Sequence, residues 1–110
     1  MRVSYRQAAR DDVVRQFRYY LVTLSLPEVA VRFRDAVRLT VQSLRQHPSL
    51  GPRYLIRNPQ LQNLRVWPVG GFGAIGIYYL VDNDTLRVIR ILHGNRDVRR
   101  ILEHEELDWP

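Results

Sequence analysis

Apolar residues recur every three or four positions through the first half of the chain. One stripe lies between Gln7 and Leu24, and its members are Ala9, Val13, Phe17, Tyr20, Leu21 and Leu24. A second stripe follows Pro27, and its members are Ala30, Phe33, Val37, Thr40, Val41 and Leu44. Because this period places apolar side chains on one side of a helix, the sequence predicts two amphipathic helices. Their short link predicts an antiparallel helical hairpin.

The link between the two predicted helices has the residues of a helix start. Ser25 is a suitable N-cap, Glu28 lies three residues later as in a capping box, and Pro27 suits the first turn. We therefore expect the second helix to begin with Ser25 as its cap. The segment 47–52, which contains two prolines and a glycine, predicts the end of that helix.

Beyond Gly51 the pattern changes to short runs that are rich in β-branched and aromatic residues. Such runs predict strands, and glycine-rich and Asp-Asn segments between them predict turns. The predicted strands are residues 54–57, which is the weakest candidate, 64–69, 74–81 and 86–92. A turn is expected at Asn58-Pro59, and residues 97–106 predict a short terminal helix.

Residues 3–5 are too short to assign alone, but they add a first strand to the predicted order. The expected fold class is therefore α+β, with an N-terminal helical hairpin packed on one face of a small, mainly antiparallel sheet in the order β-α-α-β-β-β-α. A length of 110 residues suits one domain, and we expect residues 1–110 to form it.

Composition removes several classes of chemistry. The chain has no Cys, which excludes disulfides, thiolate nucleophiles and Cys-based metal sites. Its three His residues lack metal-ligand spacing, so we expect neither a metal nor a cofactor. No Ser lies in the strand-turn-helix context of a hydrolase nucleophile. We find no signal peptide and no apolar run of about 20 residues, and we expect a cytoplasmic protein without a membrane partner.

The charge of the chain is positive and uneven. All 17 basic residues are Arg, and the formal net charge is +6. Residues 1–102 carry +10, whereas the end of the chain carries −4 from Glu103, Glu105, Glu106 and Asp108. An Arg-rich body suits an acidic partner or a nucleic acid. The acidic run is typical of a solvated terminus.

The last third of the chain carries the most specific pattern. It includes residues 64–69 and 77–79, and above all the run Ile89-Arg90-Ile91-Leu92-His93-Gly94-Asn95-Arg96-Asp97. This run resembles the C-terminal half of ParE-type toxins of the ParE/RelE type II toxin–antitoxin superfamily, and weaker agreement covers essentially the whole chain. The residues that carry the signature are Arg90, His93, Gly94 and Asp97.

These signature residues also suggest structural roles. We expect Arg90 to form a salt bridge to a carboxylate such as Asp97. His93 and Gly94 are expected to end the strand and turn the chain, and Asp97 to cap the last helix.

The resemblance implies a toxin that inhibits DNA gyrase and so replication. It also implies an acidic, ParD-like antitoxin that neutralises the toxin in a hetero-oligomer. RelE-type members of the superfamily instead cut messenger RNA on the ribosome, with groups supplied by Arg, Lys and Tyr or His. Carried onto this chain, the Arg of the central strand falls at Gly76 and the Tyr of the last helix falls near Leu102. Only Arg96 matches a catalytic Arg, and Arg65 at best stands in for a Lys of the preceding strand.

The resemblance therefore favours a protein that is not an enzyme. An endoribonuclease stays open as the alternative, with Tyr78, Tyr79 or His93 as a proton donor from an unfamiliar position. A non-toxic binding module of the same fold is the third hypothesis.

We expect two binding surfaces. The target is expected to contact an exposed face of the sheet and its end, because Trp and Arg often dominate interface energies. The residues proposed for that contact are Arg65, Trp67, Arg96, Arg99 and Arg100, and a buried core position is an equal alternative for Trp67. The antitoxin is expected on the outer face of the hairpin and the adjacent sheet, at Phe17, Tyr20, Phe33 and Val37.

Overall fold

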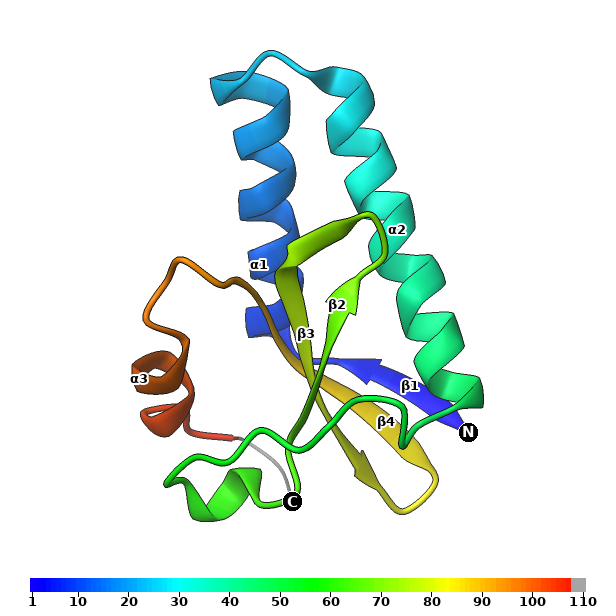
Figure 1. Ribbon diagram of the computed structural model, residues 1–110, viewed down its shortest axis with the longest axis vertical. Helices are drawn as coiled ribbons and strands as arrows, with labels where there is room; N and C mark the ends of the chain where they lie inside the picture. The colour runs from blue at the N-terminus through cyan, green and yellow to red at the C-terminus, as the bar shows by residue number, and fades with distance from the viewer. Residues whose placement is uncertain (108–110) are drawn as a thin grey trace.

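Two helices form where the apolar stripes predict them. The computed structural model describes residues 1–107, and Asp108 of the acidic run lies outside the described residues. Helix α1 spans Gln7–Arg18, continues as a π-helical turn over Tyr19–Thr23, and is followed by α2 over Pro27–Gln46. The two helices lie side by side as the predicted hairpin (Figure 1).

Four strands form one sheet beneath this hairpin. They are β1 (Arg2–Tyr5), β2 (Arg65–Val69), β3 (Phe72–Asp82) and β4 (Thr85–His93). Their order across the sheet is β1-β4-β3-β2, with β1 parallel to β4 and the other pairs antiparallel. A short helix, α3 (Val98–Glu103), follows the last strand. The predicted α+β class, with helices packed on a mainly antiparallel sheet, is confirmed.

The sheet is covered on both faces. One apolar cluster joins α1 and α2 to one face, with Phe33, Leu44, Ile77 and Tyr79 among its most buried members. A second cluster joins the other face to α3 and to residues 54–64. The expectation of an exposed sheet face is therefore wrong, because the long segment before β2 folds back over that face and buries its apolar side chains there.

That segment does not contain the predicted strand at residues 54–57. It has one isolated bridge, between Arg53 and Arg65, and then a short 3-10 helix over Pro59–Leu61 in place of the expected turn. The ring of Tyr54 packs edge-on against Tyr78 at 5.2 Å. The apolar residues of this segment therefore cover the sheet instead of extending it.

The start of α2 also differs from the prediction. Its N-cap is Leu26, without a side-chain hydrogen bond, and Ser25 has a φ of 53°. In that left-handed conformation Ser25 turns the chain, so it does not cap the helix. The π-helical turn before it was not predicted, because such turns have no periodic sequence signal.

Helix α3 is shorter than the predicted range 97–106. Asn58 Nδ2 donates hydrogen bonds to the carbonyl oxygens of Leu102 and Glu105 at 2.9 and 3.0 Å. Gln60 Nε2 donates to Leu107 O at 3.3 Å, and Gln60 Oε1 accepts the Leu107 N–H at 3.0 Å. These bonds draw the chain away from a helical path after Glu103. Within residues 1–107, no helix combines the length and the apolar character needed to cross a bilayer.

Candidate functional site

Among residues 1–107, the outer edge of β4 has no strand partner beyond Val88, because β1 ends there. Backbone and side-chain groups from the start of the chain take over its hydrogen bonds. Arg6 donates its backbone N–H to Val88 O at 3.0 Å and Nη1 to Ile89 O at 3.3 Å. Asp12 Oδ2 accepts the Ile91 N–H at 2.9 Å. These contacts satisfy an edge that would otherwise be an exposed pairing template.

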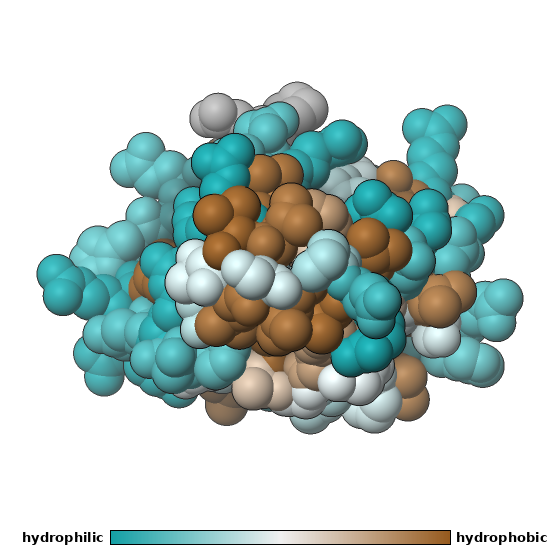
Figure 2. All heavy atoms as spheres, turned by 90° about the horizontal axis from the view of Figure 1, so that it is seen from above, coloured by the Kyte–Doolittle hydropathy of each residue, from teal (hydrophilic) through white to brown (hydrophobic). Residues whose placement is uncertain are grey.

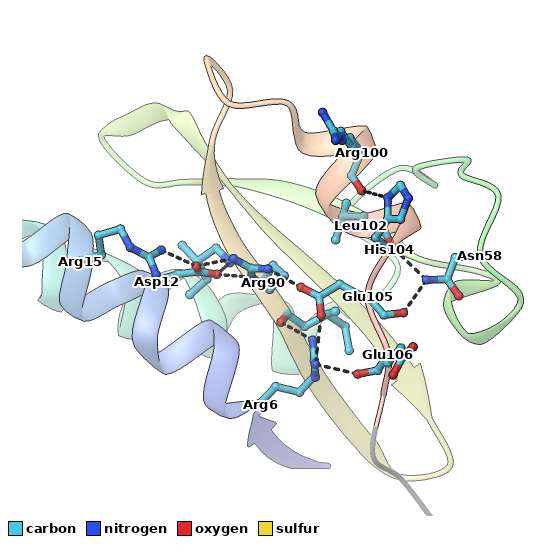
Figure 3. Close-up of polar contacts among 12 residues, drawn as sticks. Arg6, Asp12, Arg15, Asn58, Arg90, Arg100, Leu102, His104, Glu105 and Glu106 are labelled. Atoms are coloured by element: carbon cyan, nitrogen blue, oxygen red, sulfur yellow. Dashed lines mark hydrogen bonds and ion pairs between the residues drawn. The ribbon is translucent and has the colours of Figure 1, made fainter.

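A bulge in the same stretch directs Arg90 toward that edge. Tyr78 pairs with Arg90, but Tyr79 pairs with Val88, so one extra residue lies in β4. Arg90 Nε and Nη2 donate to the two oxygens of Asp12 at 2.7 and 2.8 Å, a bidentate pair. Its Nη1 pairs with Glu105 (Figure 3). Arg90 therefore links α1 to the segment after α3.

The predicted salt bridge between Arg90 and a carboxylate is confirmed, but Asp97, the partner named as an example, is not the one that forms it. Asp97 lies beyond the turn that follows β4, and its Oδ1 accepts the Arg100 N–H at 3.3 Å, so it caps α3 as predicted. Its place beside Arg90 is taken by Asp12, which is distant in sequence. The hydrogen bonds to Asp12 raise the pKa of Arg90 above its already high ordinary value, so its guanidinium is charged at any physiological pH.

The acidic end of the chain is not simply solvated. Glu105 is largely covered and also pairs with Arg6 Nη2 at 3.3 Å. Figure 3 shows the resulting cluster, in which Asp12 and Glu105 lie on either side of Arg90. Charges that are separated along the sequence thus neutralise each other in space, and this cluster has a structural role.

The remaining signature residues turn the chain after β4. His93 Nδ1 accepts the Asn95 N–H at 3.1 Å, which fixes the turn. The Gly94 N–H donates to Ala74 O at 2.7 Å, and a Cβ at Gly94 would lie 3.4 Å from that oxygen. The signature therefore shapes the end of β4 and the start of α3.

The residues predicted for target contact do not form one surface. Arg65 is half-buried, and its Nη1 donates to Gly51 O at 2.7 Å and to Ser49 O at 3.3 Å, beyond the end of α2. Trp67 is half-buried and packs against the cluster under the hairpin. Arg96, Arg99 and Arg100 are exposed on or next to α3, which covers the other face of the sheet. Two separate surfaces are therefore candidates.

The four residues predicted for antitoxin contact differ in exposure. Phe33 is fully buried and Val37 is 3% exposed, so Phe33 supports the hairpin from within. Tyr20 packs edge-on against Phe33 at 5.6 Å and lies 5.8 Å from the ring of Phe72. Phe17 is half-buried beneath the guanidinium of Arg34. Phe17 and Tyr20 thus keep part of their surface available.

A groove between β1, α1 and α2 combines apolar walls with arginines. Its volume is about 320 Å³, and its lining residues are Tyr5, Arg10, Val13, Arg34, Val37 and Arg38. The guanidinium of Arg10 lies 6.0 Å from the centre of the Tyr5 ring. Burial raises the pKa of Tyr5, while the charges of Arg10 and Arg38 act against that shift. Sequence reasoning found Val37 alone of this set, because the other residues come together only in three dimensions.

The free end of the hairpin is apolar. Five of its side chains are between 41 and 65% exposed, namely Tyr19, Leu21, Val22, Leu24 and Leu26. Figure 2, which views the molecule from above, shows an apolar patch framed by hydrophilic residues. A contiguous exposed patch of this kind is typical of a protein interaction surface.

The positions that correspond to nuclease residues carry no such chemistry. Gly76 carries no side chain, and a Cβ there would lie 3.0 Å from Val66 Cγ2 and 3.2 Å from the Tyr78 ring, so a larger residue would require these two side chains to shift. Leu102 is fully buried. The described residues contain no group of three or more His, Asp or Glu side chains that could hold a metal ion.

Both central tyrosines are also withdrawn from solvent. Tyr79 is fully buried, donates its hydroxyl to Pro48 O at 2.8 Å, and accepts the Gly51 N–H at 2.9 Å. Tyr78 is 6% exposed, and burial raises its pKa to about 12. Neither hydroxyl is placed to give a proton to an external substrate.

Comparison with known proteins agrees with this architecture. Residues 3–98 match the family model of the ParE toxin of the type II toxin–antitoxin system parDE. A solved structure described as the chromosomal ParDE TA system from P. aeruginosa is similar, with a TM-score of 0.68 and 19% identity over 84% of this chain and 95% of that chain. Comparison with curated proteins gives no match. With most of its length matched by that model, the chain belongs to the family of ParE toxins of type II toxin–antitoxin systems.

Proposed function

We propose that this ParE-family toxin inhibits DNA gyrase in the cytoplasm and so blocks replication, and that an acidic ParD-like antitoxin neutralises it in a hetero-oligomer. The choice of gyrase over RNA as the target rests on the residues at the two positions that correspond to catalytic residues of the nucleases, Gly76 and Leu102. A general acid or base must reach the proton that it transfers. Gly76 has no side chain, and the side chain of Leu102 is apolar and fully buried, so these positions supply no such group.

The groove between α1 and α2 supports an acidic partner. Its apolar walls suit a leucine or an aromatic side chain, and the guanidiniums of Arg10, Arg34 and Arg38 at its rim suit flanking carboxylates. Arg34 and Arg38 share the single carboxylate of Asp35, at 3.6 and 3.2 Å. The rim thus keeps a net positive charge, which complements an acidic segment that folds on binding.

The apolar end of the hairpin extends this surface. A partner that covers both the groove and Leu21, Val22, Leu24 and Leu26 would remove from water four exposed apolar side chains at the end of the hairpin. Antitoxin binding at this place therefore fits the predicted contacts at Phe17, Tyr20 and Val37, and leaves the α3 side of the molecule free.

The test is a supercoiling and cleavage assay with purified gyrase and plasmid DNA, run beside a ribosome-dependent messenger RNA cleavage assay. We expect linear DNA to accumulate while the RNA stays intact. Cut RNA with unaffected gyrase would instead establish the nuclease alternative. No effect in either assay, together with normal growth of cells that express the chain alone, would identify a non-toxic binding module.

A further inference from the structure

Exposed arginines gather on the side of the molecule opposite the hairpin. Within the described chain this group lies on or next to α3 and on the segment packed beside it, and its members are Arg57, Arg96, Arg99 and Arg100. Val98 and Leu102 point into the core, so helical spacing turns the arginines of this region outward. We call this surface the α3 face.

Contacts between α3 and residues 54–57 bring two of the members, Arg57 and Arg99, together. Arg99 Nη1 donates to Leu55 O at 2.7 Å, and its guanidinium lies 5.5 Å from the centre of the Tyr54 ring. The Arg57 N–H donates to Glu103 Oε2 at 3.1 Å. Between the two segments lies a cleft of about 490 Å³. Arg57 and Arg99 therefore line one cleft built from two parts of the chain, and Arg96 and Arg100 lie close to Arg99 in the sequence, before and on α3.

The two carboxylates near these arginines, Asp97 and Glu103, accept hydrogen bonds from backbone N–H groups, and with both counted the α3 face keeps a net charge of +2. Asp97 accepts the backbone N–H of Arg100, and Glu103 accepts that of Arg57. Among residues 1–107, no Asp or Glu oxygen lies within 4.0 Å of a side-chain nitrogen of the four arginines. Their positive charge is thus available to an external anion.

The platform that carries the arginines is well anchored. Val98 and Leu102 are buried at 6% and 0% exposure. Asn58 Nδ2 fixes the C-terminal end of α3 through the carbonyl oxygens of Leu102 and Glu105. Because the backbone that carries the arginines is already ordered, binding loses less conformational entropy than it would on a mobile segment.

We propose that the α3 face binds the phosphate backbone of duplex DNA without reading its sequence. Arginine donates in a planar fork that matches phosphate, and a highly charged, polar surface is typical of DNA interfaces. Protein interfaces instead have an apolar core, which this molecule offers at the far end of its hairpin. The biological setting rests on the proposed function, because gyrase holds DNA while a poison acts on it.

The direct test is binding of a fluorescein-labelled 20-base-pair duplex, measured by fluorescence anisotropy between 50 and 200 mM NaCl. If all four arginines contact phosphates, the slope of log affinity against log salt is about −3.6, so that affinity falls about 150-fold over this range. The triple variant Arg57→Gln, Arg96→Gln and Arg100→Gln should have a slope that is shallower by about 2.7.

A matched variant separates the α3 face from the overall charge of the protein. Arg2→Gln, Arg18→Gln and Arg32→Gln remove the same charge from exposed positions on β1, α1 and α2. We expect this control to keep a slope close to that of the parent protein. Equal slopes for the two triple variants would overturn the proposal, as would parent binding that is insensitive to salt.

A competition experiment distinguishes DNA from an acidic protein. Concentrations of the two competitors are expressed as moles of negative charge, phosphates for the duplex and carboxylates for poly-glutamate. On this scale, unlabelled duplex should displace the labelled duplex at a lower concentration than poly-glutamate does. Equal displacement by poly-glutamate would overturn the proposal in favour of an acidic protein partner. The gyrase cleavage assay is independent of these results: failure of the parent protein there would reject the proposed target, whereas the anisotropy slopes would still decide whether the α3 face binds DNA.

Discussion

Replacement of Asp12 by alanine should remove a large part of the stability of the fold. The side chain is 3% exposed and accepts hydrogen bonds from Arg90 Nε, Arg90 Nη2 and the Ile91 N–H at 2.7, 2.8 and 2.9 Å. Its removal leaves the Ile91 amide without this acceptor and takes one counter-ion from a guanidinium that is mostly buried.

The size of the effect follows from these contacts. An unsatisfied buried donor costs about 1–3 kcal/mol, and removal of one partner of a buried ion pair costs about 3–5 kcal/mol in total. Because Glu105 still pairs with Arg90, which is 13% exposed, we expect the lower end of that range. A loss of about 3 kcal/mol is large for a domain whose total stability is about 5–15 kcal/mol.

Urea unfolding followed by circular dichroism measures this loss. With a slope of about 1–3 kcal/mol per M, the midpoint should fall by about 1–3 M. Asp11→Ala is the matched control, because Asp11 is exposed and bonds only Gln7 Nε2 among the described residues, and it should change stability by about 0.5 kcal/mol or less. If Asp12→Ala lowers the midpoint no more than this control does, with an unchanged slope, the cluster does not stabilise the fold as argued.

Three further predictions follow from the structure. Gly51→Ala places a Cβ 2.6 Å from a carbonyl oxygen of β2, and we expect it to cost about 1–3 kcal/mol in urea unfolding, whereas Gly73→Ala, which meets nothing within 4 Å, should not. Burial raises the pKa of Tyr78 from 10.0 to about 12, so its contribution to stability is present below pH 10 and is lost as pH rises toward 12. Tyr78→Phe should therefore flatten the fall of the urea midpoint between pH 10 and 12, and an unchanged fall would show that other groups cause it. Joint substitution of Arg10 and Arg38 by Glu should weaken antitoxin binding in calorimetry at least tenfold without a change in circular dichroism, and unchanged affinity would place the antitoxin elsewhere.

The sequence by itself determined the local elements of this protein. Apolar spacing predicted both helices of the hairpin, and runs of β-branched residues predicted β2, β3 and β4 within a few positions. The run from Ile89 to Asp97 indicated the family, and the capping role of Asp97 followed from its place before a helix. These features depend on neighbours within a few residues, so a linear pattern can carry them.

Only the tertiary structure decided which distant residues meet. Arg90 pairs with Asp12, 78 positions away, because a bulge in β4 turns its side chain toward the edge that β1 leaves free. The segment 54–64 covers the sheet instead of joining it, since its apolar residues gain more burial there than at an edge. The groove and the α3 face likewise combine segments that no sequence spacing connects, and long-range packing alone fixes their geometry.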